Sequence, residues 1–342
     1  MDPRQPSGES FPFETTDFNG MPYRRFGTSG LQTSAVGLGT WKFGYPDTGD
    51  GSRSDEATSL AIMDRAHELG VTFWDTANRY NDGTGNSERV IGRWFDAHPE
   101  KRRDIVLATK VYGGMDGYTP NHSGLSRLQI IEGVKASLAR LGQEWVDVLW
   151  FHRFDDNTPV EESLEAVEDL VSQGLVHYLG VSQFTVENLE SYLAAADKIS
   201  RRCRVVAVQN RFDPINGEDQ PGVLDFCAAE GLSFVPFSPL GQGLLTDRYL
   251  DPAKVGKGDR LFDQGAEIPE EKIAKVRRVG ELAGEWGHSI SQLSLAYLLS
   301  LPGMGTQIPS SSTVQQLEAN AAAGRIELTD DQREQLRAAF AG

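Results

Sequence analysis

Residues 71–80 have the sequence VTFWDTANRY, in which a short apolar run ends at Asp75 and Tyr80 follows five residues later. A brief, nearly continuous apolar run is typical of a parallel strand that is buried on both faces. A polar residue at the end of such a strand lies at the edge of the sheet, where side chains from neighbouring strands meet. The segment therefore predicts a buried strand and the start of a polar site.

Two further segments have the same design. IVLATK (105–110) ends in Lys110, and VDVLWFH (146–152) ends in His152. If all three strands line a barrel, a carboxylate, a phenol, an ammonium and an imidazole meet at one mouth. Such a set of ionisable groups indicates a proton-transfer site.

Strand-like and helix-like segments alternate from residue 34 almost to the end of the chain. Eight segments are predicted strands: SAVGLGTW (34–41), VTFWDTA (71–77), IVLATKVY (105–112), VDVLWFH (146–152), VHYLGVSQF (176–184), VVAVQNRF (205–212), LSFVPFSPL (232–240) and GTQIPS (305–310). Eight strand–helix units favour an α/β fold of the closed (β/α)8 type, a TIM barrel. A doubly wound open sheet is the alternative, which we disfavour because no GxGxxG follows the first strand.

Helix signals separate the predicted strands. Residues 54–69, 126–141 and 159–172 are predicted helices, and Thr329 with Gln332 fits a capping box that opens a short C-terminal helix. Residues spaced by three and four form one apolar stripe on the second helix: Leu128, Ile131, Val134, Leu138 and Leu141.

The remaining segments predict how the barrel is closed and extended. Residues 22–33 resemble a hairpin that closes the barrel floor, whereas residues 1–21 are predicted to be a flexible N-terminal tail. Residues 22–342 then form a single barrel domain. Three longer loops are expected at the mouth: 113–125, 213–222 and 241–268.

Composition excludes several classes of partner. The 33 basic and 49 acidic residues give a net charge of −16, which argues against nucleic acid or an anionic membrane as partner. No apolar stretch reaches the roughly 18 residues of a spanning helix, and the first residues contain no signal-peptide core. Cys203 and Cys227 have no metal-ligand spacing, so we predict buried thiols, no metal site and a cytoplasmic location.

The four ionisable groups suit a particular chemistry. A free phenol titrates at about pH 10, so Tyr80 needs a neighbour that stabilises its phenolate if it is to exchange protons near pH 7. Lys110 supplies a cation, Asp75 orients that cation, and His152 polarises a carbonyl oxygen or assists proton delivery. This arrangement fits a carbonyl that receives hydride on carbon and a proton on oxygen. The hydride must come from a cofactor, because side chains are not hydride donors.

From about residue 22 to residue 342 the chain resembles the aldo-keto reductase family. The motifs that carry the resemblance are GLGTW (37–41), FWDTANRY (73–80), ATK (108–110), VDVLWFHR (146–153), GVSQF (180–184), VQN (208–210), PFSPLGQGLLT (236–246) and IPSSSTVQQLEAN (308–320). The resemblance implies a barrel that binds an extended nicotinamide dinucleotide across its mouth without a Rossmann fold. It also implies that Tyr80 is the general acid/base, with Asp75, Lys110 and His152 as partners.

The resemblance further implies a cofactor-binding set. The positions that correspond to the carboxamide contacts are Ser182, Gln183 and Gln209, and Phe237 corresponds to the aromatic ring that stacks on the nicotinamide. The pyrophosphate stretch contains Ser238, Leu240, Gln242 and Arg248, and the adenosine end contains Ser310, Ser312, Gln316 and Asn320. The motifs at the first two strand ends add Gly39, Thr40, Trp41 and Asp75.

The chain departs from the family pattern at three places. Gln183 stands where many members have Asn and keeps the amide group. Phe237 stands where many members have Tyr and keeps the aromatic ring. Many NADPH-dependent members carry Lys or Arg at the positions of Ser310, Ser312 or Gln316, where the charge meets the 2′-phosphate. In this chain those positions are neutral, which should weaken the preference for the phosphorylated cofactor. On family grounds we still expect NADP(H) as first choice, with NAD(H) as the alternative.

The substrate is predicted to be a small carbonyl compound, or a sugar or polyol in reverse. Trp41, Tyr112 and Arg153 are the predicted pocket residues, whereas Trp74 should point away from Asp75 into the helix layer. Arg153 and Arg211 follow strand ends, where they either meet an anionic substrate or are rim charges, and we favour the rim.

The primary hypothesis is an NAD(P)H-dependent reductase of aldehydes or ketones. The alternatives are an NAD-dependent sugar or inositol dehydrogenase and a cofactor-binding regulatory subunit similar to potassium-channel beta subunits. Sequence leaves the physiological substrate and the oligomeric state open.

Overall fold

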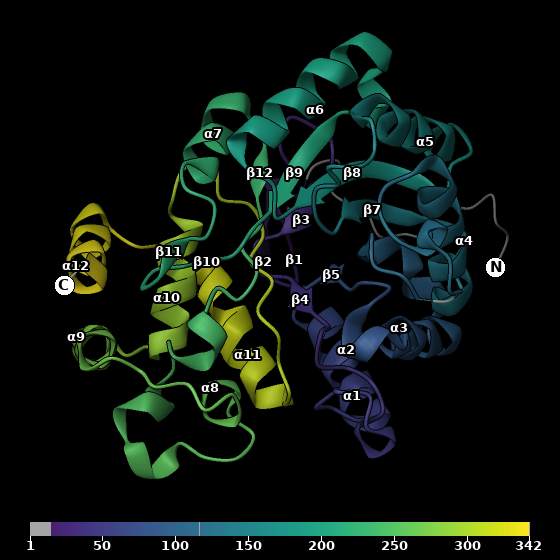
Figure 1. Cartoon of the computed structure of the whole chain (residues 1–342). Coiled ribbons are helices and arrows are strands. Elements are labelled where there is room, and N and C mark those ends of the chain that lie inside the picture. Colours follow the sequence, from purple (N-terminus) through teal and green to yellow (C-terminus); the bar gives the residue numbers. More distant parts are fainter. Residues whose placement is uncertain (1–14, 116, 342) are drawn as a thin grey trace, which may run out of the picture.

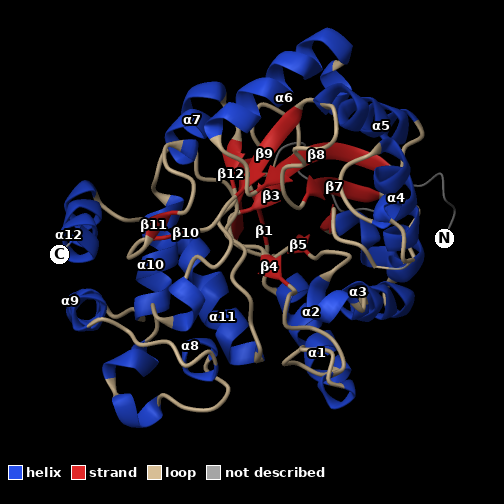
Figure 2. Ribbon diagram, in the orientation of Figure 1, coloured by secondary structure: helices blue, strands red, loops and turns tan. Residues whose placement is uncertain are grey.

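Seven strands form one parallel sheet in the computed structural model, which describes residues 15–115 and 117–341. In spatial order they are β4 (Leu38–Gly39), β5 (Phe73–Asp75), β6 (Val106–Val111), β7 (Val146–Phe151), β8 (Val176–Ser182), β9 (Val205–Gln209) and β12 (Ser233–Phe234). The sheet curls on itself and the helices surround it, as Figures 1 and 2 show. The parallel pairing in chain order is that of a (β/α)8 barrel, which confirms the predicted fold.

The eighth position of the barrel is filled by residues 303–310, which do not form a regular strand. On one side Gly305 N donates to Phe234 O at 2.7 Å, and on the other Gly37 N donates to Gln307 O at 2.7 Å. The prediction of a strand at 305–310 was therefore wrong in form but right in position. Pro309 has no N–H to donate, which interrupts a continuous ladder of hydrogen bonds.

Helices follow the strands and cover the outside of the barrel. They are α1 (Glu56–Glu68), α2 (Tyr80–Gly83), α3 (Asn86–Ala97), α4 (Arg127–Leu141), α5 (Val160–Ser172), α6 (Val186–Ile199), α7 (Val223–Glu230), α8 (Arg260–Asp263), α9 (Glu270–Trp286), α10 (Ile290–Leu299), α11 (Val314–Ala322) and α12 (Asp330–Ala341). The predicted box at the last helix is present, because Gln332 N donates to Thr329 Oγ1 at 3.2 Å and Thr329 N to Gln332 Oε1 at 3.0 Å.

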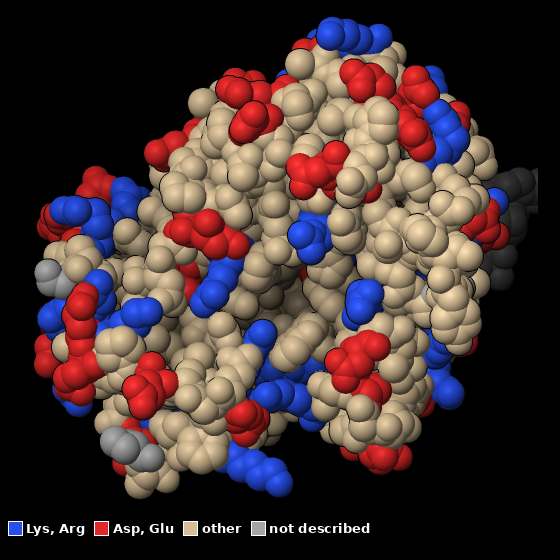
Figure 3. Space-filling view, in the orientation of Figure 1, with Lys and Arg blue, Asp and Glu red and all other residues tan. Residues whose placement is uncertain are grey.

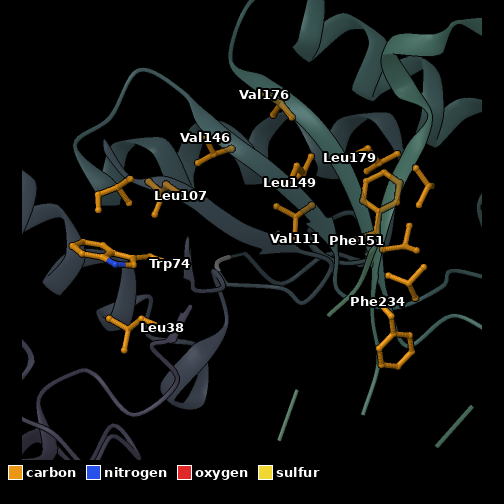
Figure 4. Packing of buried hydrophobic residues seen from close by; sticks show 14 of the residues in the cluster. Leu38, Trp74, Leu107, Val111, Val146, Leu149, Phe151, Val176, Leu179 and Phe234 are labelled. Carbon is orange, nitrogen blue, oxygen red and sulfur yellow. The ribbon is translucent and has the colours of Figure 1, made fainter. Parts of the chain in front are cut away.

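Side chains alternate between the two faces of each strand, as the period of a strand requires. On β7, Leu149 and Phe151 face the helices, whereas Val148 and Trp150 pack inside the barrel. Figure 4 shows the outward set, in which Leu149, Phe151 and Trp74 lie between the sheet and the helix layer. This alternation sends the residues at the strand ends in a defined direction, inward to the mouth or outward to the helices.

An N-terminal hairpin closes the opposite end of the barrel. The strands β2 (Met21–Arg25) and β3 (Gln32–Ser34) pair antiparallel, as predicted for residues 22–33. Phe26, in the hairpin turn, is fully buried and its ring centroid lies 5.6 Å from that of Phe73 inside the barrel. The interior is therefore a packed core rather than a channel.

The N-terminal boundary differs from the predicted one. The strand β1 (Asp17–Phe18) pairs with β2 and Met21 is fully buried, so residues 17–21 belong to the hairpin rather than to a tail. Residues 1–14 of the predicted tail lie outside the described residues.

The apolar stripe predicted on α4 is wrong at its first position. Leu128 is 56% exposed, and the buried face instead runs through Ile130, Val134, Leu138 and Leu141. Leu128 is the second residue of α4 and lies on the exposed face of the first turn. The predicted burial of both cysteine thiols is confirmed.

Candidate functional site

Four ionisable side chains meet at the carboxyl end of the barrel strands. Asp75 is the last residue of β5, Lys110 the fifth residue of β6, and His152 follows β7. The inward positions of these strands are Phe73, Ala108 and Trp150, so Asp75, Lys110 and His152 come two residues later on the same face. Strand alternation therefore brings them together at the mouth.

Lys110 is the centre of the hydrogen-bond network. Its ammonium donates to Tyr80 Oη at 2.8 Å, to Asp75 Oδ2 at 2.5 Å and to Thr76 O at 3.0 Å. All three of its N–H bonds thus have acceptors, as a buried ammonium requires. The side chains of Lys110 and Asp75 are each only 1% exposed, so water does not screen the pair.

Tyr80 opens the short helix α2 at the edge of the site. After it, Asn81 and Asp82 have left-handed backbone with φ of 59° and 56°, which turns the chain sharply. Asn81 Nδ2 donates to Phe43 O and fastens this turn to the loop after β4. The phenol is thereby held beside Lys110, and its ring centroid lies 6.1 Å from that of His152.

Burial and charge shift the pKa values of the group. Burial, with the negative charge of Asp75 and a hydrogen bond to it, raises the pKa of Tyr80 well above its usual value. Burial lowers the pKa of Lys110, and the carboxylate of Asp75 partly offsets that effect. Burial together with the charges of Lys110, Arg79 and Arg153 lowers the pKa of His152 to about 3, so the imidazole is neutral at physiological pH.

The pKa of Tyr80 corrects one expectation from sequence. We expected the ammonium of Lys110 to make the phenol more acidic, but burial and the carboxylate of Asp75 raise the pKa of Tyr80 instead. The phenol therefore keeps its proton at neutral pH, as a proton donor requires.

Gln209 on β9 completes the inner shell of Asp75. Gln209 Nε2 donates to Asp75 Oδ1 at 2.9 Å, while Oδ2 of the same carboxylate accepts from Lys110. Both carboxylate oxygens are thus used, and Asp75 is held in one orientation.

A cavity of about 210 Å³ opens above these residues. Tyr80 and His152 line it together with Arg260 and Ile308. The predicted cofactor residues that line it are Gly39, Trp41, Asp75, Ser182, Gln183, Gln209, Phe237, Ser238 and Ser310. Residues predicted from sequence to bind the cofactor thus gather around one cavity, while their role toward a cofactor stays a prediction.

A larger cavity of about 650 Å³ adjoins the first. Trp41, Ser238, Arg260, Ile308 and Ser310 line both cavities, which makes them one continuous cleft. The predicted cofactor residues that line the outer cavity are Trp41, Ser238, Leu240, Gln242, Arg248, Ser310, Ser312, Gln316 and Asn320. The hollow is visible in the centre of Figure 3, bordered by Lys and Arg side chains.

Some predicted residues are placed elsewhere or are already engaged. Thr40 is fully buried outside both linings, and its hydroxyl hydrogen bonds with Asp75 O at 3.0 Å and Ser87 Oγ at 2.9 Å. Gln316 Oε1 accepts from Ser312 N at 2.9 Å, so these two residues bind each other at the start of α11.

Two of the three predicted substrate-pocket residues also lie outside both linings. Only Trp41 lines the cleft, whereas Tyr112 and Arg153 lie beside each other on the rim. The guanidinium carbon of Arg153 is 5.3 Å from the centroid of the Tyr112 ring.

Sequence reasoning missed four basic residues of the cleft: Lys42, Arg53, Lys257 and Arg260. Arg260 Cζ stacks 4.4 Å above the ring of Trp41, and Arg53 Nη1 donates to Gly258 O at 2.7 Å. The residues come from three separate segments, so no local pattern in the sequence groups them. The only signal was their position, since two of them follow strand β4 and two lie in the predicted mouth loop 241–268.

Three non-glycine residues of the cleft adopt left-handed backbone. Gln183, Ser238 and Gln242 have φ of 57°, 56° and 60°. This conformation is unfavourable for residues with a Cβ and is concentrated at functional sites. All three belong to the predicted cofactor-binding set.

Among the described residues, no helix has the length and apolarity that crossing a membrane requires. The same residues contain no group of three His, Cys, Asp or Glu side chains arranged to hold a metal ion.

Comparison with known proteins finds one matching family model and several relatives that align over most of the chain. The model of the aldo/keto reductase family matches residues 35–341. Aldo-keto reductase AMT2 of Alternaria alternata is 31% identical, over 92% of this chain and 90% of its own. L-glyceraldehyde 3-phosphate reductase of Escherichia coli (strain K12) is 30% identical, over 89% and 87%. A putative voltage-gated potassium channel subunit beta of Schizosaccharomyces pombe is 33% identical, over 90% of each chain.

Proposed function

The chain belongs to the aldo/keto reductase family, and we propose that it reduces an aldehyde or ketone to an alcohol with NADPH, using Tyr80 as proton donor. The observation that carries the proposal is the contact of 2.8 Å between Tyr80 Oη and Lys110 Nζ at the floor of the cleft. A phenol that is protonated, buried on one side and open to a cavity on the other suits proton delivery to a bound carbonyl oxygen.

The residues of the cleft fit a dinucleotide. The outer cavity is large, adjoins the catalytic cavity and contains Lys42, Arg53, Arg248, Lys257 and Arg260, which suit the phosphates. Gln183, Ser238 and Gln242, whose backbone is left-handed, lie in the wall of the cleft and give its backbone a sharply turned course. When bound, the nicotinamide supplies the hydride that no side chain can supply.

The protein's own groups prepare the proton transfer. Lys110 holds the phenol oxygen and stabilises the phenolate that forms when the proton leaves. Asp75, fixed by Gln209, holds Lys110 in place. His152 is neutral and lines the same cavity, so it can hydrogen bond the substrate oxygen without competing as an acid.

The preference for NADPH rests on the basic residues of the outer cavity. The neutral positions Ser312 and Gln316 led us to consider NAD as well, and with it a polyol dehydrogenase. Lys42 and Lys257 bring positive charge to the same cavity from other segments, and Arg53 lies there as well, paired with Asp263 at 3.1 Å. These charges favour the cofactor with the additional phosphate.

The test combines cofactor binding with turnover. Titration with NADPH and NADH, followed by nicotinamide fluorescence, should give the lower Kd for NADPH. A panel of aldehydes, ketones and polyols with the preferred cofactor should then show carbonyl reduction. Tight cofactor binding without turnover would instead favour the regulatory-subunit alternative.

Substitution of the phenol tests the mechanism. Tyr80→Phe should bind NADPH with an affinity within about twofold of the parent, but its kcat should fall by about 100-fold or more because the proton donor is gone. Tyr297→Phe, on α10, is the matched control and should retain kcat. Undiminished activity of Tyr80→Phe would refute the proposed role.

A further inference from the structure

Two arginines on the rim beside the catalytic residues are not used by the mechanism. Arg79 directly precedes Tyr80, and Arg153 directly follows His152. Both side chains are exposed. They differ from the basic residues of the outer cavity because they lie at the ends of β5 and β7, on the catalytic side of the cleft.

One short segment after β6 holds both guanidinium groups. Arg79 Nη1 donates to Gly114 O at 3.2 Å, and a Cβ on Gly113 would lie 2.3 Å from Arg79 Cδ. Arg153 Cζ lies 5.3 Å from the ring centroid of Tyr112. The three-residue segment 112–114 therefore contacts both cations, Arg79 through Gly114 and Arg153 through Tyr112.

Neither cation is neutralised. Among the described residues, no carboxylate lies within ion-pair distance of Arg79 or Arg153, although most other arginines of this acidic chain have such a partner. A chain with a net charge of −16 has many carboxylates available for pairing. Unpaired guanidinium groups are favourable ligands for a carboxylate or a phosphate, because one guanidinium can bind such an anion through two N–H groups.

The charge of this pair reaches the reacting centre. Arg79 and Arg153 both contribute, after burial and Lys110, to keeping His152 neutral. The electrostatic influence of both guanidinium groups therefore extends to the place where His152 faces the cavity.

From this geometry we propose that the substrate is a short carbonyl compound with an anionic group, and that Arg79 and Arg153 bind that group while Tyr80 and His152 face the carbonyl. The inference rests on the proposed function and deepens it by naming the substrate class. A carboxylate and a phosphate share the required chemistry.

Matched substrate pairs test the proposal and separate the two anions. Succinic semialdehyde is compared with butanal for the carboxylate, and glyceraldehyde 3-phosphate with glyceraldehyde for the phosphate. In at least one pair, kcat/KM should be about tenfold or more higher for the anionic member. In the double variant Arg79→Gln/Arg153→Gln the ratio should fall to about one. Arg201→Gln, which removes the same charge at the opposite end of the barrel, should leave the ratio unchanged.

Two results would overturn the inference while the proposed function stands. One is a parent enzyme that uses the neutral member of both pairs at least as well. The other is a double variant that loses activity equally toward both members of a pair.

Should no carbonyl be reduced, the proposed function fails and binding alone decides the inference. Calorimetry with succinate and with glycerol 3-phosphate, against butanol and glycerol, should then show binding of an anion that the double variant lacks. Absent binding, or binding that the double variant retains, would reject the anion site.

Discussion

The ammonium of Lys110 shows how one residue organises the site. It donates to a phenol, a carboxylate and a backbone carbonyl at once, and its side chain is 1% exposed. Removal of the Asp75 carboxylate would destabilise the protein, because the buried ammonium of Lys110 would then lack a compensating charge. The position of Tyr80 therefore depends on Asp75 as much as on its own backbone.

Lys42 is a second informative residue, and its titration gives a prediction for cofactor binding. Burial and the charges of Arg53, Arg260 and Arg248 lower its pKa to about 8. A bound phosphate favours the ammonium and raises that pKa in the complex. Affinity for NADPH should therefore be full below pH 8 and weaken at higher pH, by at most about tenfold per pH unit.

The prediction is tested by fluorescence titration from pH 6.5 to 9.5 with the parent and with Lys42→Met. The variant should bind more weakly at pH 7 and should lose most of the decline above pH 8. An identical decline in the two proteins would show that another group titrates.

At the scale of elements, the alternation of the strands decides which side chains reach the mouth. Gly180 on β8 illustrates how tightly neighbouring strands pack, because a Cβ at this position would lie 2.3 Å from the ring of Trp150. The ring fills the barrel interior beneath His152 and cannot move far. Gly180 is thus required by the close approach of a tryptophan rather than by backbone conformation.

Gly180→Ala should therefore lower the free energy of unfolding by about 1–3 kcal/mol through overpacking. Gly284→Ala is the matched control, since a Cβ there meets nothing within 4 Å and the residue lies in α9. That variant should gain about 0.5–1 kcal/mol from the higher helix propensity of alanine. Urea unfolding measures both, and equal stabilities of the two variants would contradict the packing argument.

At the scale of the whole molecule, the barrel separates its floor from its mouth. The hairpin places Phe26 at the lower end of the interior, where its ring centroid lies 6.2 Å from that of Trp150. The catalytic side chains lie at the opposite end of the strands. Stability of the floor and chemistry at the mouth are therefore expected to respond to different substitutions.

Phe26→Ala should accordingly lower the free energy of unfolding by about 3–5 kcal/mol, because it leaves a cavity in the interior. At 25 °C, kcat/KM of the folded protein should stay within about twofold of the parent. Thermal unfolding and steady-state assays measure the two effects. A large loss of kcat/KM in fully folded protein would show that the floor and the mouth are coupled.

Local patterns predicted much of this molecule. Apolar runs gave the positions of the strands, and the residues at their ends gave Asp75, Lys110 and His152, because a strand period of two determines the direction of each side chain. The same reasoning predicted that Trp74 points to the helix layer, where it packs against Trp94 at 4.6 Å between ring centroids. Such features depend on neighbours along the chain.

Other features were decided only by contacts between distant segments. Leu128 fits the apolar spacing of its helix but has no neighbour to bury it. The pKa of Tyr80 is set by burial and by Asp75, which a sequence does not reveal. The basic residues of the outer cavity gather only in the folded barrel, and so do the contacts of Arg79 and Arg153 with segment 112–114. The order of residues therefore specified the strand-end side chains, whereas folding alone set their electrostatic environment, because burial and charge proximity arise between segments remote in the chain.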